Sequence, residues 1–253
     1  MRFRSTKYIS EFMGTMLFVF FSCGAVITFG ADYKKGTAYL ISAFAASLAF
    51  VAMHYTVSRF SGCHLNPAVS LAMLIAKKID GWDFLGYTVA QIAGSFAACG
   101  LLTAVFWGHT GNYGANTYYN DNPWITILVE LILTMTFTLV FLFTNEEKNS
   151  GICKGLALLL ASVFGIQLTG ASLNPAKSLG AAVFAGKDAL REYWAFLIAP
   201  FLGACFAALI YMALNSSEEY HALIASTSKR TEIGTVNEAL TKENTEAEEA
   251  ENL

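Results

Sequence analysis

One tripeptide occurs twice in this chain, each time in similar surroundings. Residues 62–70 read Gly-Cys-His-Leu-Asn-Pro-Ala-Val-Ser, and residues 170–178 read Gly-Ala-Ser-Leu-Asn-Pro-Ala-Lys-Ser. Asn is favoured at the N-cap of a helix, and Pro is favoured at the first helical position because its missing N–H would have no partner there. Each stretch therefore predicts the start of a helix, and the residues of the two starts are Asn66, Pro67, Ala68, Asn174, Pro175 and Ala176.

The composition predicts a membrane protein. Of the 253 residues, 55% are hydrophobic and 14% are charged, whereas a soluble domain has about 25% charged residues. A membrane-spanning helix needs about 20 predominantly apolar residues. We therefore expect an all-α integral membrane protein with six spans, at about residues 8–30, 38–58, 84–107, 123–144, 153–170 and 193–214.

Two shorter apolar runs, at about 67–76 and 175–186, begin at the two motifs. Ten helical residues extend about 15 Å, which is half of a hydrocarbon core of about 30 Å. Such helices can enter the membrane but cannot cross it. We expect two re-entrant half-helices in addition to the six spans.

The two halves of the proposed channel domain, residues 1–214, resemble each other. Glu11 and Glu130 occupy matching places in the first and fourth spans, and Gln91 and Pro200 in the third and sixth. Each half has three spans, an odd number, so the second half must enter the membrane from the opposite side. This predicts an inverted 3+3 repeat, with its halves at about 8–108 and 123–214.

The inversion would bring the N-termini of the two half-helices together near the middle of the membrane. A helix N-terminus has unpaired N–H groups and about half a positive charge. Non-helical backbone at that depth is tolerated where it is buried in protein or lines a water-filled cavity. Two positive helix ends would repel cations, and the Asn66 and Asn174 amides could donate N–H groups to a water oxygen. The pattern predicts a pore for neutral molecules.

This arrangement resembles the aquaporin, or major intrinsic protein, family over about residues 8–214. The resemblance rests on the two Asn-Pro-Ala motifs, the paired Glu residues, the Gln91 and Pro200 positions and the layout of spans. It implies a passive channel, not an enzyme, which forms a homotetramer with one pore per subunit and uses no cofactor or metal. By analogy, Glu11 and Glu130 would be buried and accept hydrogen bonds from the re-entrant loops; otherwise they are ordinary polar residues near span ends.

The resemblance also locates the narrowest ring of the pore, by spacing from the two motif asparagines. Strict water channels usually have an aromatic residue, a His, a small residue and an Arg in this ring. The small residues here predict a wider ring with one hydrogen-bond donor fewer, while a Lys keeps the positive charge. A shift of register in the second span would instead bring Phe50 towards the ring and narrow it. The four expected filter residues are Ala46, Ser162, Ala171 and Lys177.

We therefore expect a water channel that also passes glycerol, urea or ammonia and excludes protons and ions. Ser178 and Ala182 are typical of the water-selective members, whereas Leu197 is typical of glycerol facilitators. A glycerol facilitator with little water selectivity, a secondary transporter and a closed junctional protein are the alternatives. The sequence places no evident acidic residue at mid-membrane to carry the coupling ion of a transporter.

Two residues of the first motif loop have further expected roles. His64 could line the pore vestibule, where it could also respond to pH, or it could be a structural loop residue. Cys63 is expected to expose a thiol beside the pore, which would make the channel partly sensitive to mercurials. The five cysteines have no metal-ligand or pairing pattern.

The distribution of Lys and Arg predicts that both termini lie in the cytoplasm. We also expect a plasma-membrane protein that does not bind nucleic acid. Lys and Arg accumulate on the cytoplasmic side of a membrane protein. Residues 215–253 hold 3 Lys and Arg against 9 Asp and Glu, which is typical of a disordered acidic tail. The basic residues expected on the cytoplasmic side are Arg2, Arg4, Lys7, Lys77, Lys78, Lys148 and Lys154, and those expected outside are Lys34, Lys35, Lys187 and Arg191.

Overall fold

A computed structural model describes residues 2–29, 37–107 and 112–216 of the chain. The chain divides into two compact units, Met1–Tyr211 and Met212–Leu253. The predicted tail, except its first two residues, lies outside the described residues, and so do Lys34 and Lys35.

The described residues form helices joined by loops, and six of these helices are long and apolar enough to cross a membrane. Two shorter helices begin at the Asn-Pro-Ala motifs. This architecture confirms the predicted all-α fold of six spans and two half-helices. The elements are α1 (Arg2–Phe29), α2 (Ala38–Ser61), α3 (Pro67–Ile75), α4 (Gly81–Val105), α5 (Pro123–Phe143), α6 (Ser150–Thr169), α7 (Pro175–Ala185) and a last helix, Lys187–Ser216.

Several helices begin earlier than the hydropathy pattern predicts. Helix α4 begins at Gly81 because the Asp80 side chain caps it, accepting a hydrogen bond from the Asp83 N–H over 2.7 Å. This bond lowers the pKa of Asp80. The last helix begins at Lys187, six residues before the predicted apolar run. Hydropathy detects only the apolar part of a helix, and its polar first turn is missed.

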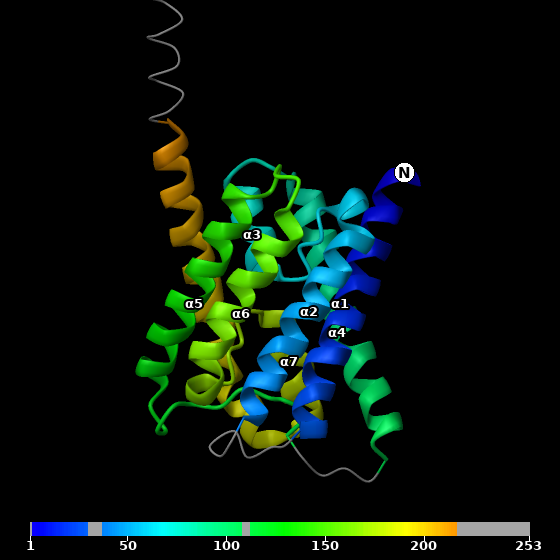
Figure 1. Ribbon diagram of the computed structural model, residues 1–253, viewed down its shortest axis with the longest axis vertical. Helices are drawn as coiled ribbons and strands as arrows, with labels where there is room; N and C mark the ends of the chain where they lie inside the picture. Colours follow the sequence, from blue (N-terminus) through cyan, green and yellow to red (C-terminus); the bar gives the residue numbers. More distant parts are fainter. Residues whose placement is uncertain (1, 30–36, 108–111, 217–253) are drawn as a thin grey trace, which may run out of the picture. The chain divides into compact units, whose positions relative to one another are not determined.

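The half-helices lie inside the first unit, among the long helices. Helix α1 packs against α2 and α4, and α6 packs against α2 and α5. Helix α3 contacts α4 and α5, α7 contacts α4, and α3 and α7 contact each other. Figure 1 shows α3 and α7 extending from the middle of the unit towards its opposite ends.

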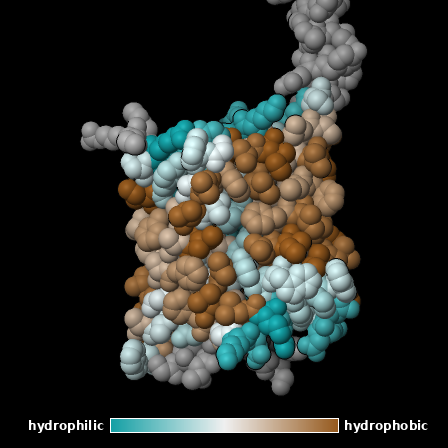
Figure 2. Space-filling model, turned by 180° about the vertical axis from the view of Figure 1, so that it is seen from behind, coloured by the Kyte–Doolittle hydropathy of each residue, from teal (hydrophilic) through white to brown (hydrophobic). Residues whose placement is uncertain are grey.

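The outer surface of the long helices is apolar over most of its length. Figure 2 shows hydrophobic residues over the middle of one face and hydrophilic residues towards its two ends. Four exposed tryptophans lie at or near helix ends, as expected of residues at a membrane–water interface. They are Trp82, Trp107, Trp124 and Trp194.

Candidate channel and selectivity filter

The two motif loops have the same local structure. The Asn66 side chain caps α3 by accepting a hydrogen bond from the Ala68 N–H over 2.9 Å. The Asn174 side chain caps α7, accepting bonds from the N–H groups of Ala176 at 3.0 Å and Lys177 at 3.2 Å. Proline follows each asparagine as the first helical residue. The two helix starts predicted from the sequence are confirmed.

The same two asparagines connect the tips of the half-helices. The Asn66 Nδ2 donates to the Leu173 carbonyl over 2.7 Å, and the Asn174 Nδ2 donates to the Leu65 carbonyl over 2.7 Å. An asparagine amide has two N–H groups. One N–H of each amide thus holds the opposite loop, and the other is left to interact with a molecule between the tips.

Two buried carboxyl groups, at matching positions of the two repeats, accept hydrogen bonds from the backbones of the two motif loops. Glu11 on α1 accepts hydrogen bonds from the backbone N–H groups of His64 at 2.9 Å and Leu65 at 2.7 Å. Glu130 on α5 accepts from the N–H groups of Ser172 and Leu173, both at 2.9 Å. Both glutamates are 0% exposed.

The loop backbones adopt a conformation that needs this support. Cys63 and Leu65 have φ of 56° and 52°, and Ala171 and Leu173 have φ of 46° and 51°. A non-glycine residue with positive φ costs about 1–3 kcal/mol and persists only when its surroundings fix it. The hydrogen bonds to the glutamates hold two successive N–H groups of each loop and fix this conformation.

Three further residues position the loops, and the sequence reading did not identify them. Ser61 donates to Glu11 and Thr169 donates to Glu130, each from the last residue of the helix before the loop. Asn116 donates to the Thr169 carbonyl over 3.0 Å and accepts from the Ser178 hydroxyl over 2.7 Å. The matching positions of Ser61 and Thr169 in the two repeats are a signal that could have found them, whereas Asn116 has no counterpart of this kind.

A small cavity lies between the tips of the half-helices, and we call it the midplane cavity. It has a volume of about 10 Å³, close to the space that a single water needs. Its lining combines polar groups of the two motif asparagines and His64 with the aromatic rings of Phe18, Phe50 and Phe137. Its lining residues are Phe18, Phe50, His64, Leu65, Asn66, Phe137, Leu158, Ser172, Leu173 and Asn174.

A second cavity, here called the filter cavity, contains all four expected filter residues, Ala46, Ser162, Ala171 and Lys177. Its volume is about 30 Å³. It adjoins the midplane cavity, because Phe18, Leu158 and Ser172 line both. The two cavities together form a narrow path that leads from the Asn-Pro-Ala tips past Lys177.

The register of α2 decides which side chains surround the filter cavity. Ala46 lines it, whereas Phe50 lies one turn further along and lines the midplane cavity. Lys177 is 9% exposed, and among the described residues no carboxylate lies within ion-pair distance of its ammonium. The four expected filter residues thus combine three small side chains with one lysine that has no ion-pair partner among the described residues.

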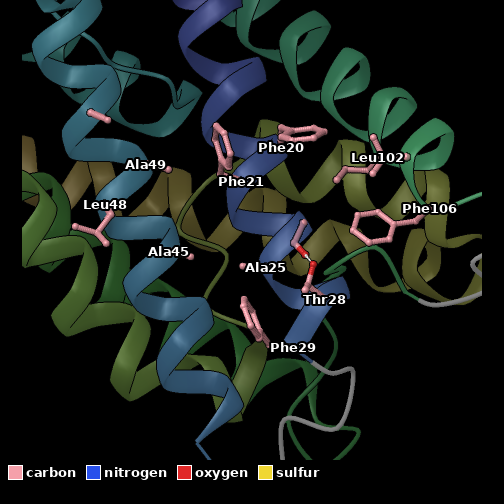
Figure 3. A pocket seen from close by; sticks show the side chains of 13 residues that line it. Phe20, Phe21, Ala25, Thr28, Phe29, Ala45, Leu48, Ala49, Leu102 and Phe106 are labelled. Atoms are coloured by element: carbon pink, nitrogen blue, oxygen red, sulfur yellow. Dashed lines mark hydrogen bonds between the residues drawn. The ribbon is translucent and has the colours of Figure 1, made fainter.

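A larger cavity of about 630 Å³ lies elsewhere, between α1, α2 and α4. Figure 3 shows Phe20, Phe21 and Phe29 of α1 and Leu48 of α2 around it. None of the motif or filter residues lines it, and its walls are almost entirely apolar. This groove is open on the outer surface of the helices and is not part of the pore path.

The structure buries Lys154 and Cys63. Lys154, which we expect near the cytoplasmic end of a span, is the fifth residue of α6 and is 0% exposed. Cys63 was expected to expose its thiol beside the pore, but it is also 0% exposed and does not line either cavity of the path. The Cys63 side chain packs in the hydrophobic core, and His64 lines the midplane cavity instead.

The burial of Cys63 reverses the expected mercurial sensitivity. A buried thiol away from the path is inaccessible to a hydrated mercury ion. Cys63→Ser should therefore leave any mercurial inhibition of water flux unchanged, as measured by titrating mercuric chloride against proteoliposomes. Loss of inhibition in this variant would show that the thiol is reached.

The fold, the paired motif loops and the narrow path define a membrane channel, and the chain belongs to the major intrinsic protein family, whose model matches residues 2–211. It is an integral, multi-pass channel of a family that passes water or glycerol-type small solutes, and it is not an enzyme.

Its relatives include proteins named as aquaporins and a protein named as glycerol uptake facilitator-like. It is 31% identical over 225 residues to Aquaporin Z of Rhodopseudomonas palustris, covering 83% of this chain and 94% of that protein. It is 35% identical over 221 residues to the glycerol uptake facilitator protein-like 6 of Lactiplantibacillus plantarum, covering 84% and 99%. The crystal structure of the aquaglyceroporin from Plasmodium falciparum has the same fold, with a TM-score of 0.72 and 23% identity, over 82% of this chain and 95% of that one.

Proposed function

We propose that this protein is a passive channel for water that also passes small neutral solutes such as glycerol, urea and ammonia and excludes protons and ions. The observation that carries the proposal is the pair of cross-connected helix tips at the midplane cavity. There, two helix N-termini and two asparagine amides face a space for about one water. Neutral molecules with an acceptor oxygen fit these donors.

Ion exclusion follows from the charges along the path. The N-termini of α3 and α7 each have about half a positive charge, and both are directed towards the midplane cavity. The Lys177 side chain adds a full positive charge at the filter cavity. A cation would lose its water shell in a narrow site that repels it. A water bound between the two tips would be oriented by its oxygen, which interrupts a chain of proton transfer.

The small filter residues support a broad choice of neutral solutes. Ala46, Ser162 and Ala171 leave more room than an aromatic residue and a His would. A glycerol facilitator with little water selectivity is the second candidate, and the same residues favour it. Water and glycerol permeabilities of proteoliposomes, measured side by side by stopped-flow light scattering, distinguish the two. Glycerol flux no faster than in empty liposomes would contradict the broad filter.

Lys177→Arg should make the channel more selective for water. Arg presents a planar fork with five donors, whereas Lys is a point charge on a flexible stem. We expect the ratio of glycerol to water permeability to fall roughly tenfold, the factor that about 1.4 kcal/mol produces.

The matched control is Lys187→Arg. Lys187 is an exposed residue at the start of the last helix. This control should keep the wild-type permeability ratio. An unchanged ratio in Lys177→Arg would show that Lys177 does not set the solute choice.

We further propose a homotetramer in the plasma membrane, with both termini in the cytoplasm and a channel domain of residues 1–214 followed by an acidic tail. The apolar outer faces of the long helices support contacts with lipid and with other copies. Lys77, Lys78, Lys148 and Lys154, all near helix ends on the proposed cytoplasmic side, support the orientation. Chemical cross-linking in native membranes tests the tetramer, and protease access to the termini tests the orientation.

A further inference from the structure

On the side of the midplane cavity away from Lys177, the next turn of the surrounding helices carries basic and aromatic side chains. Three residues that line the midplane cavity each have a partner one helical turn nearer the loop between α5 and α6. The pairs are Phe50 and His54 on α2, Phe137 and Phe141 on α5, and Leu158 and Lys154 on α6. Residues four apart lie on the same helix face. We therefore expect the partners to continue the lining of the pore, and we call His54, His64, Phe141 and Lys154 the basic layer.

The Lys154 ammonium lies in the middle of this layer. Its Nζ is 3.7 Å from the centroid of the Phe141 ring and donates to the Asn145 Oδ1 over 3.2 Å. The Phe141 ring in turn packs edge-on against His64, with 5.7 Å between ring centroids. The lysine thus connects the end of α5 with the first motif loop through one aromatic ring.

The basic layer excludes water in this conformation. Lys154 and Phe141 are 0% exposed, His64 is 1% exposed and His54 is 6% exposed. The His54 Nδ1 is nevertheless a buried nitrogen without a hydrogen-bond partner among the described residues. Buried polar atoms of this kind are usually satisfied by water.

A lysine that is 0% exposed inside a helix bundle needs a functional reason. Within the described ranges, no carboxylate forms an ion pair with Lys154. An ionisable residue inside a membrane bundle is rare and costly, and such residues mark the paths of substrates or ions. A hydrophobic side chain would fill the same space without this cost.

We infer that Lys154 forms a second constriction of the permeation path and that its side chain must leave the pore axis before a solute passes. The inference rests on the proposed function. The four-carbon stem of lysine is flexible, so the ammonium can move away from Phe141 and Asn145 while keeping its charge beside the path. The pore then has one lysine on each side of the midplane cavity, and both repel cations.

The test compares the water permeability of Lys154→Ala and Lys154→Met with that of the wild type, in proteoliposomes of equal protein content. Both variants lose the contact with the Phe141 ring face and the bond to Asn145. We expect a rise of about threefold or more in Lys154→Ala, because these contacts no longer have to be broken, and a smaller rise in the longer Met variant. Lys78→Met is the matched control, since Lys78 pairs with Glu146 at the same end of the bundle but outside the path. It should behave as wild type.

The outcomes separate this inference from the proposed function. Wild-type water flux in both Lys154 variants, together with conduction by the wild type, would overturn the second constriction and leave the channel proposal intact. Absence of water flux from the wild type and from Lys154→Ala, with both folded by size-exclusion chromatography, would overturn both. Water flux through Lys154→Ala but not through the wild type would support both the second constriction and the channel proposal.

A labelling experiment tests the position independently of side-chain size. Lys154→Cys should react with a small neutral methanethiosulfonate reagent and lose water flux when it does, because the added group stays in the path. Wild type treated in the same way measures the contribution of the native cysteines, and Lys78→Cys should react without loss of flux. Absence of reaction at position 154, or reaction without inhibition, would place Lys154 outside the path.

Discussion

Glu130→Ala should abolish channel activity and leave little folded protein in the membrane. Three donors lose their acceptor in this variant: the Thr169 hydroxyl and the N–H groups of Ser172 and Leu173. A buried donor without a partner costs about 1–3 kcal/mol, so the three together cost on the order of 5 kcal/mol. This is comparable to the whole stability of many proteins. The strained φ of Ala171 and Leu173 also loses its support.

Two measurements test this prediction: the yield of monodisperse protein after detergent extraction, and the water flux of proteoliposomes that contain the recovered protein. Glu146→Ala is the control, because Glu146 follows the same helix, is largely exposed and makes a surface ion pair with Lys78. Such pairs contribute about 0–1 kcal/mol. Normal yield and flux in Glu130→Ala would show that the carboxyl group does not hold the second loop.

Gly94→Ala should also be severely destabilising, although it adds a single methyl group. A Cβ at Gly94 would lie 2.5 Å from the backbone carbonyl oxygen of Phe12 on α1. Backbone atoms cannot rotate away, so α1 and α4 would have to separate. Overpacking of this kind typically costs about 1–3 kcal/mol, and here the displaced helix also carries Glu11. We expect a clear fall in the melting temperature and in water flux.

Gly100→Ala on the same helix is the matched control. The nearest atom to a Cβ at Gly100 is 3.9 Å away, so the methyl group fits, and alanine favours the helix. This variant should be as stable as wild type or slightly more so. Gly203→Ala repeats the test in the second half, where the added Cβ would lie 2.5 Å from the Leu131 carbonyl oxygen. Equal melting temperatures for Gly94→Ala and Gly100→Ala would contradict the close contact.

Much of the fold was predictable because membrane insertion imposes simple rules on the sequence. Long apolar runs identify the spans, and runs of half that length beginning at Asn-Pro identify α3 and α7. The ends of the helices were less predictable. The last helix starts six residues before its apolar run at Lys187, and the cap at Asp80 depends on local hydrogen bonding that hydropathy does not detect.

The site was predictable where the two repeats match and less so where they differ. Glu11 and Glu130 have the same partners at corresponding positions of the two loops, so the comparison of the halves pointed to both. Gln91 adds a fourth hydrogen bond to Glu11 that Pro200 cannot provide to Glu130. Lys154 has no signal of this kind, because a lysine near the start of a span is usually taken as an interfacial residue.

We propose that neutral molecules cross this protein passively while protons do not. Water flux and proton flux measured in the same proteoliposomes test it most directly, with an osmotic gradient for the first and a pH-sensitive dye for the second. We predict water flux above that of empty liposomes, proportional to the osmotic gradient and independent of sodium or proton gradients, with proton flux equal to that of empty liposomes. Proton flux that rises with protein content would show that the pore conducts protons, and solute flux that saturates and follows an ion gradient would show a transporter instead of a passive channel.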